Sequence, residues 1–223
     1  MVTRELKIED VAFGGKGVAR DNGKAVFIPY SIEGELVSAR IVREKKSFAE
    51  AELIEVLEPS PHRVAPECPY FERCGGCSYQ HISYPHQLEL KARQVEQAFR
   101  RIGRLAEPPM CPIIPSPRPY GYRNRITVHA LDGVVGYYRR DAHQLVDVKH
   151  CPIAATEVNE SLAQLRAGRV RDGHYTLRAQ SGPRVFSQTN DAVGEALVAV
   201  IEEAIPAGQK LLIDAYCGSG FFS

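Results

Sequence analysis

Three cysteines within a short stretch constrain this chain more than any other feature. Cys68, Cys74 and Cys77 follow the spacing C-x5-C-x2-C, with two glycines between the last two. Three thiols cannot all pair with one another as disulfides, whereas three thiolates supply three ligands of a tetrahedral metal site or an iron–sulfur cluster. Cys151, within a His-Cys-Pro sequence, is the candidate for the fourth ligand. The sequence therefore predicts a four-cysteine site, whose ligands suit zinc as well as iron.

The composition is that of a globular protein, since 44% of the 223 residues are hydrophobic and 25% are charged. The net charge is +1, but residues 59–150 carry 13 basic and 8 acidic groups, and most of the basic ones are arginines. Arginine suits phosphate binding and base stacking. The sequence shows no basic-then-apolar leader and no apolar run long enough to cross a membrane. We therefore expect a cytoplasmic monomer with reduced cysteines and no membrane partner.

Residues 1–58 predict a small β-barrel. Alternating apolar residues, glycine-containing hairpin turns and two longer strands at 35–43 and 49–57 fit several short strands. Such a set in under sixty residues is typical of an OB-like barrel.

Residues 59–105 are expected to form the cysteine loop and then a helix. Ser83 is the expected N-cap, with Pro85 in the first turn. Apolar residues at helical spacing predict one buried face, made of Leu88, Ala92, Val95, Phe99 and Ile102. The arginines of this helix, Arg93 among them, are expected mostly on its solvated surface.

Residues 106–190 are predicted to form an α+β domain that begins with a proline-rich connector at 106–119. Cys111 lies in the connector and is expected to be a bystander, because no other cysteine is near it in sequence. The expected elements are strands at 126–130, 134–139 and 145–148, a helix at 156–166, and strands at 175–179 and 184–187.

Residues 191–223 are predicted to begin a further domain. A helix capped by Asp191 leads to Leu211–Asp214, an apolar run that resembles a buried parallel strand. The G-x-G loop at 218–220 follows it, and glycines there let the backbone approach a nucleoside ligand. A lone G-x-G is weak evidence, but the preceding strand favours an S-adenosylmethionine fold. We expect the sequence to be truncated within this domain.

Two further motifs are candidates for ligand contacts. Tyr122, Arg123 and Arg125 combine an aromatic ring with two guanidinium groups, which suits unpaired bases and phosphates; an ordinary strand with surface arginines fits equally well. Gln188 follows a predicted strand and has both a donor and an acceptor with which to read a ligand.

Taken in order, these motifs resemble the RNA uracil-5-methyltransferase family over the whole chain. The stretch 28–35 resembles a TRAM domain, an RNA-binding barrel, and Lys16, Arg20 and Lys24 are then candidates for RNA contacts on its rim. The resemblance implies an α+β protein with an OB-like barrel (TRAM), a cluster-bearing central domain and the first strand of a Rossmann-like methyltransferase domain.

The same resemblance implies two cofactors. One is a 4Fe–4S cluster held by Cys68, Cys74, Cys77 and Cys151. The other is S-adenosylmethionine, for which the matching positions are Gln188, Tyr216, Gly218, Gly220 and Phe221, the last in place of a polar residue common in the family.

Members of this family methylate carbon 5 of uridine in ribosomal or transfer RNA. Their nucleophilic cysteine adds to carbon 6, and a glutamate later removes the carbon 5 proton from a uridine that has left its stack. Both residues follow the G-x-G motif in the family, so no catalytic residue is expected in this chain, which we predict to be inactive alone.

Two other classes of protein remain open. A stand-alone iron–sulfur or RNA-binding module is disfavoured by the unfinished strand at 211–214. A radical-type RNA modification enzyme is disfavoured by its usual C-x3-C-x2-C spacing and by a barrel at the other end of the chain.

Overall fold

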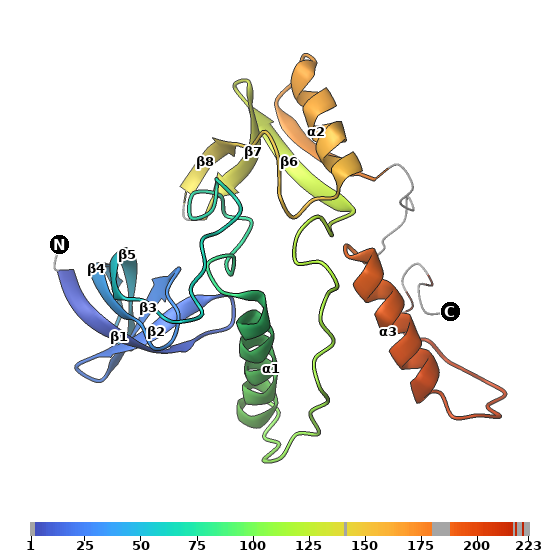
Figure 1. Ribbon diagram of the computed structural model, residues 1–223, viewed down its shortest axis with the longest axis horizontal. Coiled ribbons are helices and arrows are strands. Elements are labelled where there is room, and N and C mark those ends of the chain that lie inside the picture. Colours follow the sequence, from blue (N-terminus) through green and yellow to red (C-terminus); the bar gives the residue numbers. More distant parts are fainter. Residues whose placement is uncertain (1–2, 141, 180–187, 216, 218–219, 221–223) are drawn as a thin grey trace. The chain divides into compact units, whose positions relative to one another are not determined.

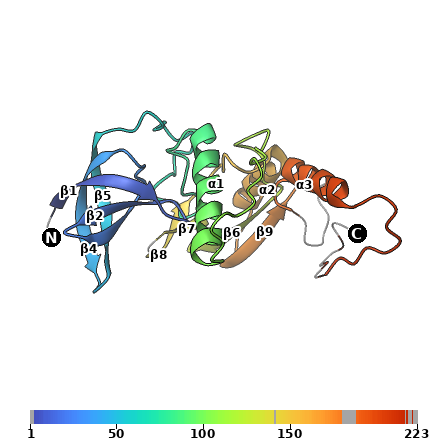
Figure 2. The same ribbon diagram turned by 90° about the horizontal axis from the view of Figure 1, so that it is seen from below.

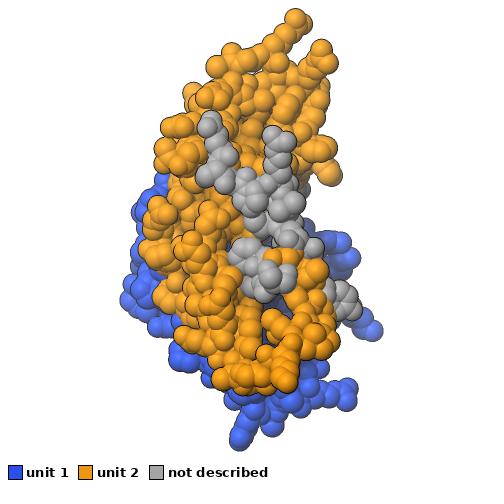
Figure 3. Space-filling view, turned by 90° about the vertical axis from the view of Figure 1, so that its right-hand side faces the viewer, with its two compact units in different colours: residues 1–113 blue, residues 114–223 orange. Residues whose placement is uncertain are grey.

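The computed structural model describes residues 3–140, 142–179, 188–215, 217 and 220. They form two compact units, Met1–Ile113 and Ile114–Ser223, coloured separately in Figure 3. The boundary falls in the predicted proline-rich connector, where residues 104–119 contain neither helix nor strand. In the described part of the chain, no helix has the length and hydrophobicity to cross a membrane.

The first unit begins with a closed five-stranded barrel, which confirms the predicted barrel (Figure 1). The strands are β1 (Thr3–Val11), β2 (Lys16–Asp21), β3 (Lys24–Pro29), β4 (Leu36–Glu44) and β5 (Phe48–Glu58). Their order is β1-β2-β3-β5-β4, and only the β3–β5 pair is parallel. Closure leaves no open sheet edge.

Alternation along the strands explains the barrel interior. Ile8, Val26, Ile28 and Val37 are each at most 1% exposed, while their neighbours along each strand point outward. The β2–β3 hairpin turns at Asn22-Gly23, where both residues have positive φ, 50° and 81°. That geometry is the type I′ turn expected of an Asn-Gly pair.

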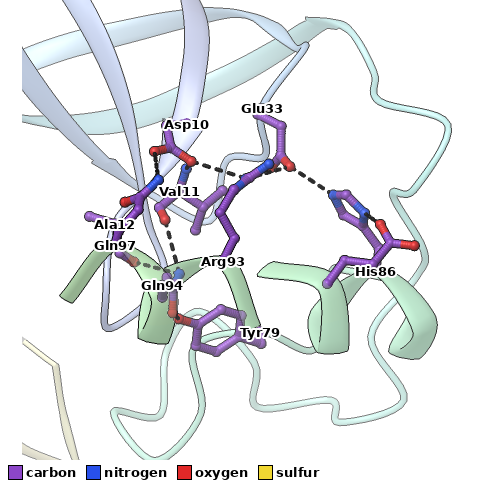
Figure 4. A network of polar contacts seen from close by, with 10 residues as sticks. Asp10, Val11, Ala12, Glu33, Tyr79, His86, Arg93, Gln94 and Gln97 are labelled. Carbon is purple, nitrogen blue, oxygen red and sulfur yellow. Dashed lines mark hydrogen bonds and ion pairs between the residues drawn. The ribbon is translucent and has the colours of Figure 1, made fainter. Parts of the chain in front are cut away.

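Helix α1 (Tyr84–Arg101) docks on the barrel through polar side chains, as Figure 4 shows. Arg93 donates to Asp10 and Glu33 at 3.0 and 2.9 Å, and Gln94 donates to the carbonyl of Val11 at 2.9 Å. His86 lies 2.9 Å from Glu33. Thus Arg93, expected on the solvated surface, is an anchor of the helix.

The prediction that the apolar face of this helix is buried is wrong. Val95, Phe99 and Ile102 are 49%, 47% and 84% exposed, whereas Leu90, outside the predicted face, is fully buried with Ile82. The reason is that hydrogen bonds to the barrel set the orientation of the helix, and apolar periodicity does not detect them.

The second unit contains a four-stranded antiparallel sheet in the order β8-β7-β6-β9 (Figure 1, Figure 2). Its strands are β6 (Arg125–Leu131), β7 (Val134–Arg139), β8 (Ala142–Asp147) and β9 (Gly173–Arg178). Helix α2 (Thr156–Ala167) packs beside β9. Ile126, Val128 and Val135 of the sheet are buried, as are Val158 and Leu162 of α2.

The last elements differ from expectation in two places. Helix α3 (Asp191–Ala204) is capped by Asn190, whose Oδ1 accepts the N–H of Val193 at 3.3 Å, and not by Asp191. The predicted buried strand at 211–214 is absent, since these described residues form no strand and Leu211 is 75% exposed. A parallel strand is buried by its neighbours, and no described strand pairs with this segment. The predicted strand at 184–187 lies outside the described residues.

Candidate nucleic-acid interface and thiol sites

A pocket of about 410 Å³ opens in the second unit where β6 and β7 diverge. These two strands pair only between His129↔Gly136 and Leu131↔Val134, so the other half of β6 lacks β7 as a neighbour. The described lining residues include no carboxylate: Arg123, Arg125, Ile126, Thr127, Tyr137, Thr176, Arg178 and Thr189. We call this the arginine pocket.

Strand register concentrates positive charge in the arginine pocket. Arg125 and Arg178 are direct partners across β6 and β9, so their side chains leave the same face of the sheet. Arg123 precedes them, and its Nε is buried with no hydrogen-bond partner among the described residues. The described lining residues thus supply three guanidinium groups and no carboxylate, a set that suits a phosphate.

Tyr122 does not belong to the arginine pocket. On either side of it, Gly121 donates to Pro152 O and Arg123 donates to Ile153 O, each at 2.9 Å. Tyr122 lines a second pocket of about 250 Å³, which Arg118 also lines.

Asn124 is a structural residue that the sequence reasoning missed. It is 7% exposed, and its Nδ2 donates to the carbonyl of Gln188 at 2.8 Å and to the carboxylate of Asp191. Its own N–H donates to Thr189 O at 3.1 Å. Asn124 thus ties the predicted cofactor residue Gln188 to the start of β6, and no sequence pattern signalled this.

The cysteine loop of the first unit is anchored by Phe71, which is 9% exposed. Its ring centroid lies 5.2 Å from that of Tyr30 and 5.5 Å from that of His81. Within the loop, the N–H of Gly76 donates to Cys74 Sγ at 3.4 Å. Hydrogen bonds to sulfur of this kind tune cysteine ligands in iron–sulfur proteins.

A buried ion pair lies beneath the cysteine loop. Glu35 is fully buried and accepts from Arg63 Nε at 2.6 Å and Nη2 at 2.8 Å. The N–H groups of Ile32 and Ser60 also donate to its carboxylate, at 2.9 and 3.2 Å. Burial alone would raise the pKa of Glu35, but these hydrogen bonds and the charge of Arg63 outweigh it and lower the pKa below its usual 4.5.

His81 lies beside this pair and is 1% exposed. Burial, assisted by the positive charge of Arg63, lowers the pKa of His81 from 6.5 to about 4. The negative charge of Glu35, and after it the backbone of Ser31, oppose that change, and both ring nitrogens are buried without a hydrogen-bond partner of normal geometry among the described residues. The ring is therefore neutral at pH 7.

Cys151 is held by α2 in the second unit. Its N–H donates to Asn159 Oδ1 at 2.8 Å, and Asn159 Nδ2 donates to the carbonyls of Cys151 at 3.0 Å and Ala154 at 3.1 Å. Asn159 is 8% exposed. One amide thus fixes the backbone on both sides of the thiol.

Replacing Asn159 with alanine is expected to lower the free energy of unfolding by about 2 kcal/mol, because buried backbone groups lose their partners. Urea denaturation followed by circular dichroism measures this. Gln164→Ala, at an exposed position of the same helix, is the matched control with an expected change under about 0.5 kcal/mol. Equal losses in the two variants would contradict the anchoring role.

The four predicted cluster ligands, Cys68, Cys74, Cys77 and Cys151, are all described, and no three of them converge on a metal position. Among the described residues, no three His, Cys, Asp or Glu side chains converge on a metal position. Gly220 has φ of +74° and donates to Cys217 O at 2.9 Å. Tyr216, Gly218 and Phe221 lie outside the described residues.

Comparisons with known proteins give sequence matches in both units. Residues 2–54 match the TRAM domain model. An uncharacterized RNA methyltransferase of Bdellovibrio bacteriovorus is 34% identical over 98% of this chain and 61% of its own length. One from Gloeobacter violaceus is 39% identical over 74% of this chain and 37% of its own length. The chain thus spans roughly a third to three-fifths of these curated relatives.

A solved structure gives the same fold. The Pyrococcus abyssi tRNA (uracil-54, C5)-methyltransferase, in complex with S-adenosyl-L-homocysteine, matches 98% of this chain and 69% of its own with a TM-score of 0.70. The chain is therefore similar to RNA methyltransferases over nearly its whole length. The 19% identity of that structure supports likeness of fold alone. This similarity supports the resemblance seen in the motifs, while the uracil-5 target, the cluster, the target RNA and the individual site residues stay predictions.

Proposed function

We propose that the 223-residue chain forms the RNA-binding and cluster-binding part of an S-adenosylmethionine-dependent enzyme that makes 5-methyluridine in ribosomal or transfer RNA. The arginine pocket carries the proposal, because three arginines and no carboxylate occur among the described residues that line it, in a chain similar to RNA methyltransferases. Arg123 and Arg125, predicted to bind RNA, both line it. The proposed partner is a structured RNA with an unstacked uridine.

The methyl donor would contact the segment that Asn124 holds. S-adenosylmethionine supplies the methyl group, and Gln188 is the described residue proposed to bind it, together with Gly220 and the predicted positions Tyr216, Gly218 and Phe221. Asn124 donates to the backbone carbonyl of Gln188, and the side-chain amide of Gln188 offers both a donor and an acceptor with which to bind a ligand.

The proposed metal group is a 4Fe–4S cluster, although no three of the four cysteines converge on one position in the structure. Cys68, Cys74, Cys77 and Cys151 would hold it, and four thiolates match its ligand requirement. The Gly76 N–H directed at Cys74 Sγ supports iron–sulfur over an inert thiol. Zinc remains the competing metal, since it accepts the same four ligands.

Methyl transfer itself would require the cysteine and glutamate that the family places after the G-x-G motif. We therefore propose that the 223 residues bind RNA as a monomer but do not methylate it. Incubation with labelled S-adenosylmethionine and unmodified RNA is expected to give no labelled product. Labelled 5-methyluridine would overturn this part of the proposal.

The arginine pocket gives a prediction for RNA binding. Replacing Arg125 and Arg178 together with glutamine is expected to reduce the slope of log affinity against log salt concentration by about 1.4, or about 0.7 for each lost phosphate contact with single-stranded RNA. Fluorescence anisotropy with a labelled single-stranded oligouridine measures the slope.

Arg169→Gln combined with Arg171→Gln is the matched control, because these exposed arginines lie in the same unit outside the pocket. The control is expected to keep the original slope. Equal slopes in both double variants, or no RNA binding by the unaltered chain, would overturn the arginine pocket as the RNA site.

A further inference from the structure

We propose that a row of four rings across the outer face of the second unit's sheet stacks unpaired bases of the same RNA. The row consists of His174, His129, Tyr138 and His143. This inference rests on the proposed function, and it adds a base-binding site next to the arginine pocket.

The ring row crosses every strand of the sheet. Ring centroids of His174 on β9 and His129 on β6 lie 6.5 Å apart. His129 lies 4.6 Å from Tyr138 on β7, and Tyr138 lies 6.0 Å from His143 on β8. These separations fall within the usual range for ring contacts. The result is a continuous aromatic strip perpendicular to the strands.

The row shares its face with the arginines because of the β6–β9 register. Three successive cross-strand pairs on this face are Arg125↔Arg178, Thr127↔Thr176 and His129↔His174. The middle pair is joined by a hydroxyl–hydroxyl hydrogen bond of 3.1 Å. His129 lies four positions after Arg125 along β6, a distance of about 13 Å along the strand.

The opposite face of the sheet packs in the hydrophobic core, so core packing and the proposed base stacking use different faces. Ile126, Val128 and Ala130 alternate with the row and are at most 6% exposed. His143 and His174 are exposed, and His129 and Tyr138 are half-buried. The rings therefore do not build the hydrophobic core. Among the described residues no histidine trio converges on a metal position.

Unpaired bases are the ligand that fits such a face. Every base offers a π-face to an aromatic ring, and single-stranded RNA is bound by aromatic residues beside positive charge. Threonine hydroxyls between the two rows add donors and acceptors for sugar or base edges. Bases within a duplex are stacked on one another, so the ring row selects single strands.

Binding of a labelled single-stranded oligouridine to the 223-residue chain tests the proposal. Tyr138→Leu is expected to weaken binding by about 5- to 150-fold, the range for losing one stacked base, without changing the salt slope. Tyr138→Phe keeps the ring and is expected to retain the affinity. His174→Leu, at an exposed position, is the second variant and is expected to weaken binding in the same way. Affinity for duplex RNA is expected to change in none of them.

The outcomes separate the ring row from the proposed function. If Tyr138→Leu and His174→Leu bind the oligouridine as tightly as the unaltered chain, while the Arg125 and Arg178 double variant still loses salt slope, the ring row is wrong and the RNA site stands. If Tyr138→Phe loses as much affinity as Tyr138→Leu, stacking is also excluded. If the unaltered chain binds no RNA, both proposals fail.

Discussion

Replacing Cys151 with alanine is expected to remove nearly all bound iron from the chain. Anaerobic purification of the unaltered chain should give a brown protein with about four irons, as a four-cysteine cubane site requires. Cys151 is 9% exposed and held by Asn159, so the substitution removes a thiol whose backbone is already positioned. The visible spectrum together with iron and sulfide analysis measures the loss.

Cys111→Ala is the matched control for this experiment. Cys111 is exposed in the connector between the two units, and its removal is expected to leave the iron content unchanged. A colourless unaltered chain that carries zinc would replace the cluster with a zinc site. Full retention of iron in Cys151→Ala would remove Cys151 from the ligand set.

Glu35→Gln is expected to lower the free energy of unfolding of the first unit by about 3 kcal/mol, the low end for breaking a buried ion pair. The low end applies because Arg63 remains 22% exposed and can rehydrate. Urea denaturation at pH 7 measures this. Glu52→Gln, which breaks the exposed pair with Arg40, is the control and is expected to cost less than about 1 kcal/mol.

The same pair predicts how stability depends on pH. Because the pKa of Glu35 is lowered on folding, its contribution is present above its unfolded value near 4.5 and is lost as pH falls through the folded pKa. Glu35→Gln should therefore reduce the fall in stability below pH 4.5, the acid limb of the curve of unfolding free energy against pH. The lowered pKa of His81, about 4 against 6.5 unfolded, adds a separate loss as pH falls from 6.5 to 4, which the variant should retain. An unchanged limb below pH 4.5 would contradict the role of Glu35.

Local patterns in the sequence were sufficient for the barrel and for most of the second sheet. Alternation and positive-φ turns are properties of adjacent residues, so the turns at Asn22-Gly23 and Asp132-Gly133, all four residues with positive φ, leave a local pattern in the sequence. The likeness to RNA methyltransferases likewise followed from the order of the motifs.

Features that depend on distant partners were missed. The orientation of α1 follows from hydrogen bonds between Arg93 and Gln94 and residues about eighty positions earlier. The arginine pocket follows from a register that brings Arg178 opposite Arg125. Neither relation leaves a periodic trace in the sequence.

The partners of Glu35 have a consequence for where the first unit can be divided. The TRAM match ends at residue 54, yet Ser60 and Arg63 beyond it satisfy the buried carboxylate, and Tyr30 of the barrel contacts Phe71 of the cysteine loop. A barrel cut at the limit of the TRAM match would keep a buried charge without its counterion. The part of the chain that must fold together is therefore longer than the TRAM match. Substitutions in the cysteine loop that disrupt these contacts are expected to lower the melting temperature of the barrel as well.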